Sequence, residues 1–341
     1  DTDPTLLDTY CRQADYVFHL AGVNRPKDPE EFMKGNFGFT SVLLDTLKKY
    51  NNTAPVLITS SIQAALDNPY GKSKLEGEKL MFAYAKETGA TVYVYRLPNV
   101  FGKWCRPNYN SAVATFCYNI ANDLPITVND PNVIMNLVYI DDVVNSFIGK
   151  LTGREEYKCA MCFNVYEKVE PIHVVNLGEI VDLLYSFKES RKSLSVPKLD
   201  NPFEKALYST YLSYLPQDQF SYPLKMNVDN RGSFTEIIRT ADRGQFSVNI
   251  SKPGITKGNH WHNTKNEKFL VVSGKGVIRF RSLDSSNILE YYVSGDKLEV
   301  VDIPVGYTHN IENLGDTDMI TFMWCNECFN PERPDTYFEE V

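Results

Sequence analysis

The chain has 341 residues, of which 13% are aromatic, and a formal net charge of −8. This length predicts two domains with separate cores, and the acidic balance argues against a general nucleic-acid-binding protein. No apolar run is long enough for a transmembrane helix, and no signal peptide is visible, so the odd number of cysteines (seven) favours reduced thiols in a cytoplasmic protein.

Strands alternate with helices in the front half. We expect strands over 15–22, 56–61 and 91–96, and helices over 39–50 and 69–88. This alternation predicts an α/β fold, a Rossmann-like doubly wound parallel sheet, in which ligands bind beyond the carboxyl ends of the strands. Small or hydroxyl residues, Ala21-Gly22 and Ser60-Ser61, stand at two such ends.

Tyr70 and Lys74 open the second of these helices and share one of its faces. A nearby ammonium favours the phenolate, so we expect Lys74 to lower the pKa of Tyr70 and let it exchange a proton near neutral pH. A hydroxyl of Ser60 or Ser61 would hold the carbonyl that is being reduced. Tyr-x3-Lys alone is a weak signal in a chain with 21 tyrosines, but its place after a strand ending in Thr-Ser-Ser makes it informative.

This order of motifs resembles the extended short-chain dehydrogenase/reductase family from about Asp15 to Asp142. In that family the tyrosine donates the proton, the lysine also bonds the nicotinamide ribose, and the serine orients the substrate carbonyl. The resemblance implies that Ser61, which matches better than Ser60, is catalytic together with Tyr70 and Lys74. It also implies binding residues: Leu20, Ala21, Gly22, Asn36 and Lys74 for the NADPH cofactor, and Asn99 for a nucleotide-sugar diphosphate. Helix or turn capping is the alternative role for the two asparagines.

One segment of that family has no counterpart in this sequence. The family begins with a strand, a Gly-x-x-Gly-x-x-Gly loop, a helix and a second strand, and the glycines let the backbone approach the cofactor pyrophosphate. This sequence starts where the family is already past its second strand. We therefore expect either a fragment of a longer protein or a front half that is impaired as a reductase.

Domain boundaries are indicated by composition. Apolar residues at helical spacing over 177–187 predict a helix that closes the first domain, and prolines among polar residues predict a linker over 190–223. We expect an N-terminally truncated reductase domain over 1–215 and a second domain over 222–341. Residues 231–236 would form the turn and entry strand of the second domain.

The rear half carries candidate metal ligands. His260 and His262 lie two residues apart, so on a strand their side chains point to the same side, and Glu267 and His309 would complete the set from neighbouring strands. Imidazole and carboxylate ligands suit Zn, Fe, Ni or Mn. Histidines satisfied in a β-rich core are the alternative. The spacing nevertheless fits a two-part metal signature, apart from a glycine, Gly295, that stands three residues too early.

This signature resembles that of the cupin family, small double-sheet β-barrels that hold a metal or a substrate in their lumen. Short apolar runs agree with an all-β barrel. We expect strands over 267–273, 275–280, 290–293, 298–303 and 319–324.

Two Cys-x-x-Cys pairs, Cys159/Cys162 and Cys325/Cys328, raise the alternative of a zinc ribbon. They lie far apart in sequence, lack turn glycines and stand in apolar, strand-like contexts. We therefore interpret them as buried structural thiols.

Together the two halves resemble the family of CapF-type bifunctional UDP-sugar epimerase/reductases of capsular polysaccharide synthesis. Stretches at 22–26, 101–111, 207–215 and 229–276 extend this resemblance over essentially the whole chain. It implies that the cupin domain inverts C3 of a UDP-2-acetamido-2,6-dideoxy-4-hexulose. The other domain would then reduce the C4 ketone with NADPH to UDP-2-acetamido-2,6-dideoxy-L-talose, on the route to UDP-N-acetyl-L-fucosamine. A homodimer and a zinc ion in the cupin are implied as well.

The residues leave the acid/base of epimerisation open. A 4-keto group acidifies the C3 proton, and a cation or hydrogen-bond donors stabilise the enolate. Lys257, Tyr307 and the imidazoles are candidates, and four protein ligands mildly favour a structural metal. Two other classes stay open: a metal-dependent dioxygenase or isomerase acting on a small organic substrate, and a non-catalytic or epimerase-only sugar-nucleotide-binding protein.

Overall fold

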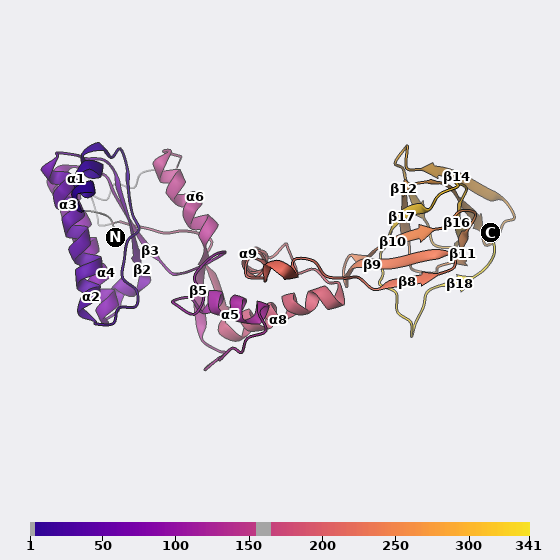
Figure 1. Cartoon of the computed structure of the whole chain (residues 1–341), viewed down its shortest axis with the longest axis horizontal. Coiled ribbons are helices and arrows are strands. Elements are labelled where there is room, and N and C mark those ends of the chain that lie inside the picture. The colour runs from indigo at the N-terminus through magenta and orange to yellow at the C-terminus, as the bar shows by residue number, and fades with distance from the viewer. Residues whose placement is uncertain (1–3, 155–164) are drawn as a thin grey trace. The chain divides into compact units, whose positions relative to one another are not determined.

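A computed structural model describes residues 4–154 and 165–341. The chain divides into two compact units, one of Asp1–Tyr185 with Leu199–Pro216 and one of Ser186–Lys198 with Gln217–Val341. In Figure 1 the labelled helices all precede β8, and every labelled element after it is a strand. None of the described helices is long and apolar enough to cross a membrane.

The front unit is an α/β structure, as predicted. Its helical elements are α1 (Pro4–Gln13), α2 (Glu30–Phe32), η1 (Met33–Gly38), α3 (Phe39–Lys49), η2 (Ile62–Ala65), α4 (Pro69–Thr88), α5 (Ala112–Ala121), α6 (Ile140–Leu151), α8 (Leu177–Ser193) and α9 (Pro202–Leu212). One sheet has the order β1 (Val17–His19), β2 (Val56–Ser61), β3 (Val92–Leu97) and β6 (Tyr166–Glu167), and all its pairs are parallel. A second sheet has the order β4 (Asn99–Phe101), β5 (Ile134–Tyr139) and β7 (His173–Asn176).

Most of the predicted front elements are confirmed within a few residues. The strand expected over 15–22 is shorter, because β2 pairs only with Val17–His19 and the chain then leaves the sheet. The linker expected over 190–223 is wrong for Pro202–Leu212, which form α9. Asn201 caps this helix by accepting from the backbone of Glu204, and apolar side chains such as Leu207 are buried.

Helix α4 has strong local start and stop signals. The side chain of Asn68 accepts a hydrogen bond from the backbone of Gly71, and Pro69 occupies the first turn, where its missing N–H costs nothing. The helix ends at Gly89, whose φ of 78° is a left-handed conformation that glycine adopts without strain. Because these caps set where α4 begins and ends, they determine which of its residues face β2 and which lie at the end of the sheet.

The front core lies between the sheet and its helices. Figure 1 shows α3 and α4 on one side of β2 and β3. Leu47 of α3, Met81 of α4, Val56 of β2 and Val94 of β3 are completely buried there. Each such side chain contributes roughly 1.5–3 kcal/mol of hydrophobic stabilisation relative to an exposed one.

A buried polar network crosses this core. Glu78 of α4 is 1% exposed; its carboxylate accepts a hydrogen bond from Ser60 at 2.5 Å and a bidentate pair from Arg96 at 2.9 and 2.6 Å. Arg96 also donates to the hydroxyl of Tyr166, over whose ring its guanidinium lies at 3.7 Å. The network ties α4 to the ends of β2 and β3, because a buried charge is tolerated only when it is paired and hydrogen-bonded.

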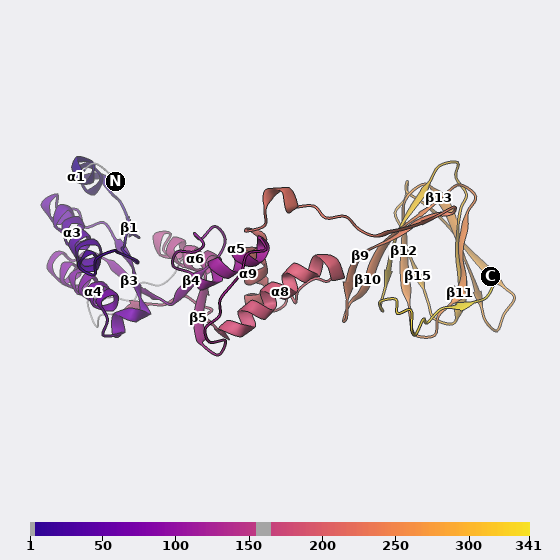
Figure 2. The same ribbon diagram turned by 60° about the horizontal axis from the view of Figure 1, so that its bottom comes forward.

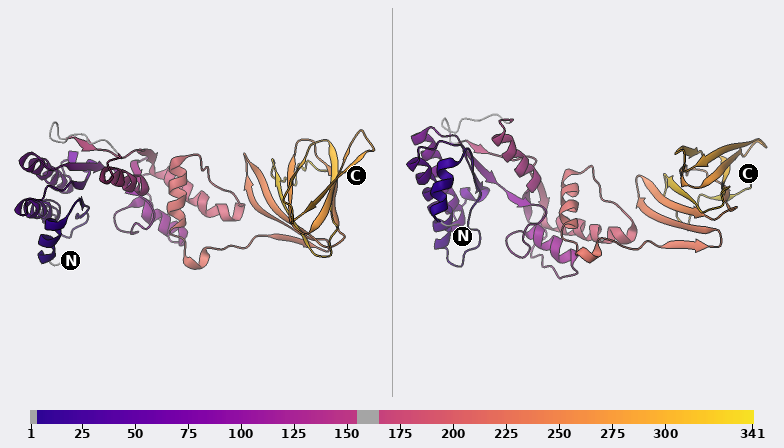
Figure 3. Two further views of the ribbon diagram at one scale, coloured as in Figure 1. Left: turned by 90° about the horizontal axis from the view of Figure 1, so that it is seen from above. Right: turned by 45° about the horizontal axis from the view of Figure 1, so that its top comes forward.

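The rear unit consists of two facing antiparallel sheets, which Figures 2 and 3 show as opposed layers. The six-stranded sheet has the order β15 (Val300–Ile303), β12 (Glu267–Ser273), β17 (Met319–Cys325), β10 (Gly244–Ser251), β9 (Gly232–Thr240) and β8 (Met226–Asp229). The five-stranded sheet has the order β14 (Ile288–Ser294), β13 (Lys275–Ser282), β16 (Tyr307–Asn313), β11 (Thr256–Trp261) and β18 (Tyr337–Phe338). A 3-10 turn, η3 (Gln217–Gln219), precedes them.

This rear unit is a cupin-type β-barrel, as predicted. Alternation of buried and exposed residues, clearest in β10, places one face of each sheet inward. Phe269 of β12, Ile278 of β13 and Ile311 of β16 belong to the apolar core between the sheets. The lumen beside this core is where side chains of both sheets meet.

We predict that Glu78→Gln destabilises the front unit by about 3 kcal/mol, the lower end of the range for breaking a buried ion pair, because Arg96 loses its charged partner. Glu76→Gln on the same helix is the matched control: its surface pair with Lys79 should contribute less than about 1 kcal/mol. Urea unfolding followed by the helical circular dichroism signal measures both. Equal losses for the two variants would contradict the role of the network.

Candidate functional sites

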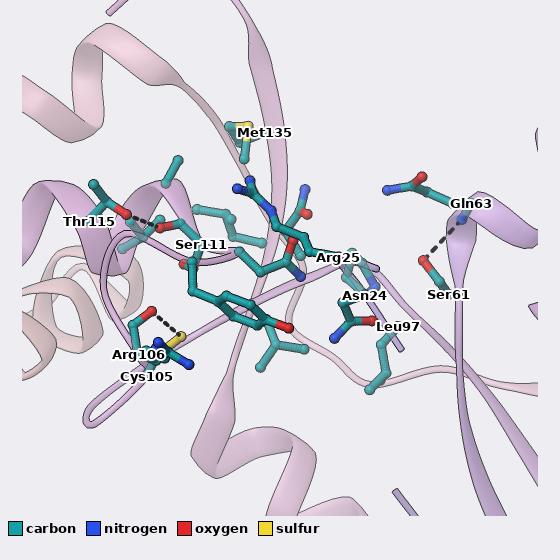
Figure 4. A pocket seen from close by; sticks show the side chains of 18 of the residues that line it. Asn24, Arg25, Ser61, Gln63, Leu97, Cys105, Arg106, Ser111, Thr115 and Met135 are labelled. Atoms are coloured by element: carbon teal, nitrogen blue, oxygen red, sulfur yellow. Dashed lines mark hydrogen bonds between the residues drawn. The ribbon is translucent and has the colours of Figure 1, made fainter. Parts of the chain in front are cut away.

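A cavity of about 1150 Å³ opens at the carboxyl ends of the front strands. Figure 4 shows side chains that line it. Six of the predicted site residues line this cavity: Leu20, Gly22, Ser61, Tyr70, Lys74 and Asn99. Parallel sheets bind ligands at this edge, so the residues lie where the fold predicts.

Two influences act on the phenol of Tyr70, and hydrogen bonding by the Ser61 hydroxyl by itself lowers the pKa of Tyr70. Burial is the larger influence, and the net result is a pKa raised above that of an exposed tyrosine. The expected lowering of the pKa of Tyr70 by Lys74 is wrong: the ammonium lies 5.8 Å from the centre of the Tyr70 ring, and desolvation of the phenolate determines the direction of the shift.

The two serines at the end of β2 have different surroundings. Ser60 is 6% exposed, and its hydroxyl donates to Glu78. Ser61 lies on the opposite side of the strand, caps η2 by accepting from the backbone of Gln63 at 3.2 Å, and reaches Tyr70. Ser61 is therefore the better placed of the two to hold a carbonyl beside the tyrosine.

Lys74 is held near the carboxyl end of β2. Its side chain is largely buried, and its ammonium donates to the carbonyl of Thr59 at 3.1 Å. A β-carbon added at Gly22 would lie only 3.0 Å from the Lys74 nitrogen, so the glycine makes room for the ammonium. Burial lowers the pKa of Lys74, while Glu78 opposes that effect.

Asn36 joins the loop after β1 to helix α4. It is 4% exposed; its side-chain oxygen accepts from Val23 N at 2.8 Å, and its amide donates to Val23 O at 3.1 Å and to Ser73 at 2.9 Å. Ser73 in turn donates to the backbone of Tyr70. The amide thus fixes the turn beside the cavity, and its direct contact with a cofactor stays a prediction, as does that of Ala21.

In the rear unit, the four predicted metal ligands come together. His260, His262, Glu267 and His309 each offer a ligand atom, and these atoms all lie within 4.8 Å of one another. His260 and His309 are cross-strand partners in β11 and β16, whereas Glu267 begins β12 in the opposite sheet. The set therefore bridges both sheets across the lumen.

The donor set fits a cation. The Nε2 atoms of His262 and His309 lie 3.3 Å from Oε2 of Glu267, and all three atoms are buried without a hydrogen-bond partner. Nδ1 of His262 donates to the backbone carbonyl of Asp335, which leaves Nε2 of the neutral ring as an acceptor facing another acceptor. Such facing acceptors are costly when buried unless a positive ion lies between them.

Protonation states in this cluster are those of metal ligands. Burial, reinforced by the neighbouring His309 and His262, lowers the pKa of His260 to about 4, so the ring is neutral at physiological pH. The pKa of Glu267 lies far below its ordinary value in spite of its burial, so its carboxylate is ionised. A neutral imidazole and an ionised carboxylate are the forms that bind a divalent metal.

Asp335 supports this cluster from the C-terminal segment, and no sequence pattern indicates that role. Its carboxylate accepts hydrogen bonds from the backbone of Asn263, Thr264 and Lys265, while its own carbonyl accepts from His262. These backbone hydrogen bonds lower the pKa of Asp335 to about 2 despite some desolvation. The residue therefore fixes the turn between two ligands and sets the tautomer of one of them.

A bulge in β11 turns a second polar side chain into the lumen. The register with β16 shifts between Gly258 and His260, and Asn259 has a φ of 56°. Gly258 is required here, because a β-carbon would lie 2.7 Å from the carbonyl of His309. As a result Lys257 and His260 both line the lumen, although they are three positions apart on the strand.

The lumen forms a cavity of about 960 Å³ that contains Lys257 and three of the four candidate ligands, His260, Glu267 and His309. Lys257 reaches across to β10 and donates to the side chain of Asn249 and to the carbonyl of Ile250, each at 2.8 Å. Burial and the nearby Arg231 lower the pKa of Lys257, while Asp229 opposes them. Tyr307, the other acid/base candidate, lines a separate cavity of about 330 Å³.

Neither Cys325 nor Cys328 belongs to this cluster. Cys325 is buried and donates to the carbonyls of Gln245 and Glu327, and burial raises its pKa to about 11. Cys328 donates to the carbonyl of Thr240. The interpretation as a buried thiol is confirmed for Cys325, whereas Cys328 is only half-buried, and Cys159 and Cys162 lie outside the described residues.

Two family models match the chain. Residues 2–165 match the NAD dependent epimerase/dehydratase family, and residues 227–337 match the polysaccharide biosynthesis C-terminal domain. The boundary between the two matches falls within the segment where the structure passes from the α/β unit to the barrel.

Individual relatives match both halves at once. The UDP-2-acetamido-2,6-beta-L-arabino-hexul-4-ose reductase of Pseudomonas aeruginosa is 46% identical over 97% of this chain and 87% of its own length. The crystal structure of the capsular polysaccharide assembling protein CapF from Staphylococcus aureus is 62% identical, with a TM-score of 0.93 over 100% of this chain and 91% of that one. A CapF structure with the inhibitor 3-isopropenyl-tropolone is 57% identical, with a TM-score of 0.87 over 100% of this chain and 90% of that one.

We predict that Asp335→Ala lowers metal affinity about 10- to 100-fold, the usual cost of removing a residue that orients a ligand. Titration with a chromophoric chelator in competition for Zn²⁺ measures it. Asp242→Ala is the matched control, because that carboxylate pairs only with Arg243 on the surface. Equal affinities for the two variants would show that the turn keeps its geometry without Asp335.

Proposed function

Because the chain belongs to the CapF-type family of two-domain proteins, we propose that it is a bifunctional UDP-sugar enzyme of capsular polysaccharide synthesis. The cupin domain would epimerise C3 of a UDP-2-acetamido-2,6-dideoxy-4-hexulose. The front domain would reduce the C4 ketone to give UDP-2-acetamido-2,6-dideoxy-L-talose. The proposal rests on two groups of side chains that the fold brings together. One is the tyrosine, serine and lysine at the edge of the parallel sheet, and the other is the His/Glu cluster in the barrel.

In the reductase half, NADPH would supply the hydride to C4. Tyr70 would give its hydroxyl proton to the C4 oxygen, which becomes an alcohol, and Ser61 would hold that oxygen by a hydrogen bond. Its raised pKa means that Tyr70 holds this proton at neutral pH. Lys74 would bond the nicotinamide ribose, and Asn99, exposed at the cavity wall, would contact the substrate diphosphate.

In the cupin half, the three imidazoles and Glu267 would hold zinc, for which four protein ligands are the usual structural complement. Zinc bound there would supply a fixed positive charge to the lumen. Lys257 is the candidate base for C3: it lines the same lumen, and its lowered pKa increases the share of neutral amine. A proton removed from C3 would leave an enolate, and its return on the other face would invert the carbon.

A homodimer is the assembly that we propose. β14 and β15 stand at the edges of their sheets, and both expose apolar side chains: Leu289 is 42%, Tyr291 50%, Tyr292 68% and Val300 59% exposed. Edge strands with exposed apolar residues are sites of association, and a second copy of this chain would cover them.

The test of function is solvent deuterium exchange at C3. Incubated with the UDP-4-keto sugar in D₂O and no nicotinamide, the wild-type chain should incorporate deuterium, because epimerisation needs no hydride. Tyr70→Phe should retain the exchange, whereas Lys257→Met should lose it and keep its bound metal. Mass spectrometry of the sugar measures the outcome. A folded, metal-loaded wild type that gives no exchange would refute the epimerase proposal, and loss of exchange in Tyr70→Phe would refute separate sites.

The test of assembly is sedimentation. Tyr292→Glu should shift the wild-type dimer to a monomer, because a buried carboxylate without a partner opposes association. Tyr185→Glu is the matched control at another exposed tyrosine, one that is 45% exposed in α8. Unchanged sedimentation of Tyr292→Glu would place any dimer contact elsewhere.

A further inference from the structure

Lys257 is held from the opposite sheet of the barrel. It lies on β11, whereas both acceptors of its side chain, Oδ1 of Asn249 and the carbonyl oxygen of Ile250, belong to β10. These strands lie in different sheets, which Figure 2 shows as opposed layers. The stem of a lysine is flexible by itself, so the two hydrogen bonds of 2.8 Å are what fixes its nitrogen in the lumen.

Asn249 is itself fixed by its neighbours. The residue is 2% exposed, and its Nδ2 atom donates to the hydroxyl of Ser251 at 3.1 Å. Ser251 is completely buried, and its carbonyl accepts a hydrogen bond from the side chain of Asn313. Residues two apart on a strand face the same side, so the Ser251 hydroxyl lies where it can hold the amide. The amide nitrogen is thereby committed, and the amide oxygen is left for Lys257.

These two acceptors determine where a neutral Lys257 presents its lone pair. An ammonium has three donors and no acceptor, so only the neutral amine is a base. The neutral nitrogen has four tetrahedral directions: the bond to carbon, two N–H bonds and the lone pair. When Asn249 and Ile250 accept the two N–H bonds, the lone pair takes the direction that remains. That direction leads away from both acceptors, and Lys257 lines the lumen, where a ligand can meet it.

Both acceptors are uncharged, which suits a base. A carboxylate in the same place would favour the ammonium, whereas an amide oxygen and a backbone carbonyl hold the nitrogen without adding a charge. The charged groups that act on Lys257 are Asp229 and Arg231, and these two pair with each other at 2.6 Å. On β16 its partner in register is the apolar Ile311. Within the described residues, therefore, no carboxylate in contact with the nitrogen offsets its burial.

We propose that Asn249 is a positioning residue of the epimerase half: together with the Ile250 carbonyl, it holds the N–H groups of neutral Lys257 so that the lone pair faces C3 of the keto sugar. This role rests on the proposed function. In the step, the C3–H bond breaks and its proton forms a new N–H bond on Lys257. The electron pair of the broken bond becomes the enolate, whose charge lies on the C4 oxygen. The two hydrogen bonds to β10 stay in place throughout, so the base needs no reorganisation.

Two substitutions at Asn249 test this role by C3 deuterium exchange. Asn249→Leu removes the acceptor and should lower kcat about 100-fold, the cost of misplacing a reacting group by about 1 Å, with KM unchanged. Asn249→Asp keeps an acceptor of the same shape but adds a charge that raises the pKa of Lys257. Exchange should fall about tenfold at neutral pH and recover as the pH is raised, because the neutral amine then forms again.

Asn230→Asp is the matched control, because it adds the same charge at an exposed residue that does not line the lumen. It should keep the rate and the pH profile of the wild type. Circular dichroism and metal content verify the fold of each variant, and the nearly isosteric Asn249→Asp keeps the test decisive if Asn249→Leu does not fold.

The pKa of Lys257 is also measured without any reaction, by nuclear magnetic resonance of protein with isotope-labelled lysine, in which Lys257→Met identifies the signal. Asn249→Asp should raise that pKa. Wild-type kcat in Asn249→Leu, or an unshifted pH profile in Asn249→Asp, overturns the positioning role while the epimerase function stands. A wild type that gives no exchange refutes the proposed function itself, and this role with it.

Discussion

The front site depends on one face of helix α4 being buried against β2. Ser73, Lys74, Gly77 and Glu78 of that face are all buried, although three of them are polar. The cost of burying them is offset by partners at fixed places: Glu78 binds Ser60 and Arg96, Ser73 binds Asn36, and Lys74 binds Thr59. Since Tyr70 lies one turn before Lys74, its position follows from this docking.

The barrel differs from the front site, because polar atoms are buried in its lumen without hydrogen-bond partners. Its lumen brings together acceptor atoms that have no partner, namely Nε2 of His262 and His309 and Oε2 of Glu267. Three different strands or turns carry the residues that supply these atoms. The backbone carbonyl of Asp335 accepts a hydrogen bond from the other ring nitrogen of His262 and so orients that ring. A protein that is folded around mutually repelling acceptors has its stability linked to the cation that binds them.

The sequence predicted what depends on local pattern. The helix expected over 69–88 is α4 to the residue, and the spacing of His260, His262, Glu267 and His309 identified the cluster of candidate ligands. Features that arise only from distant segments were missed. Asp335 meets the turn after His262 from more than 70 residues away, and the bulge at Gly258 shows no signal until β16 is placed beside it. The α9 helix was read as linker because prolines were counted as breakers, whereas Pro202 stands in its first turn.

The expectation for the pKa of Tyr70 was wrong because it considered the Lys74 ammonium and not the desolvation of the phenolate. Proximity of an ammonium suggested an acidic tyrosine, yet desolvation prevails and raises its pKa. The same force acts in the reverse direction on Lys257, whose pKa burial lowers, because the charged form of an amine is the cation. Burial thus disfavours the charged form of both side chains. A neutral phenol is a proton donor and a neutral amine is a proton acceptor. The proposed reduction would use the former and the proposed deprotonation of C3 the latter, so one physical effect shifts the two side chains toward the forms that opposite proton transfers need.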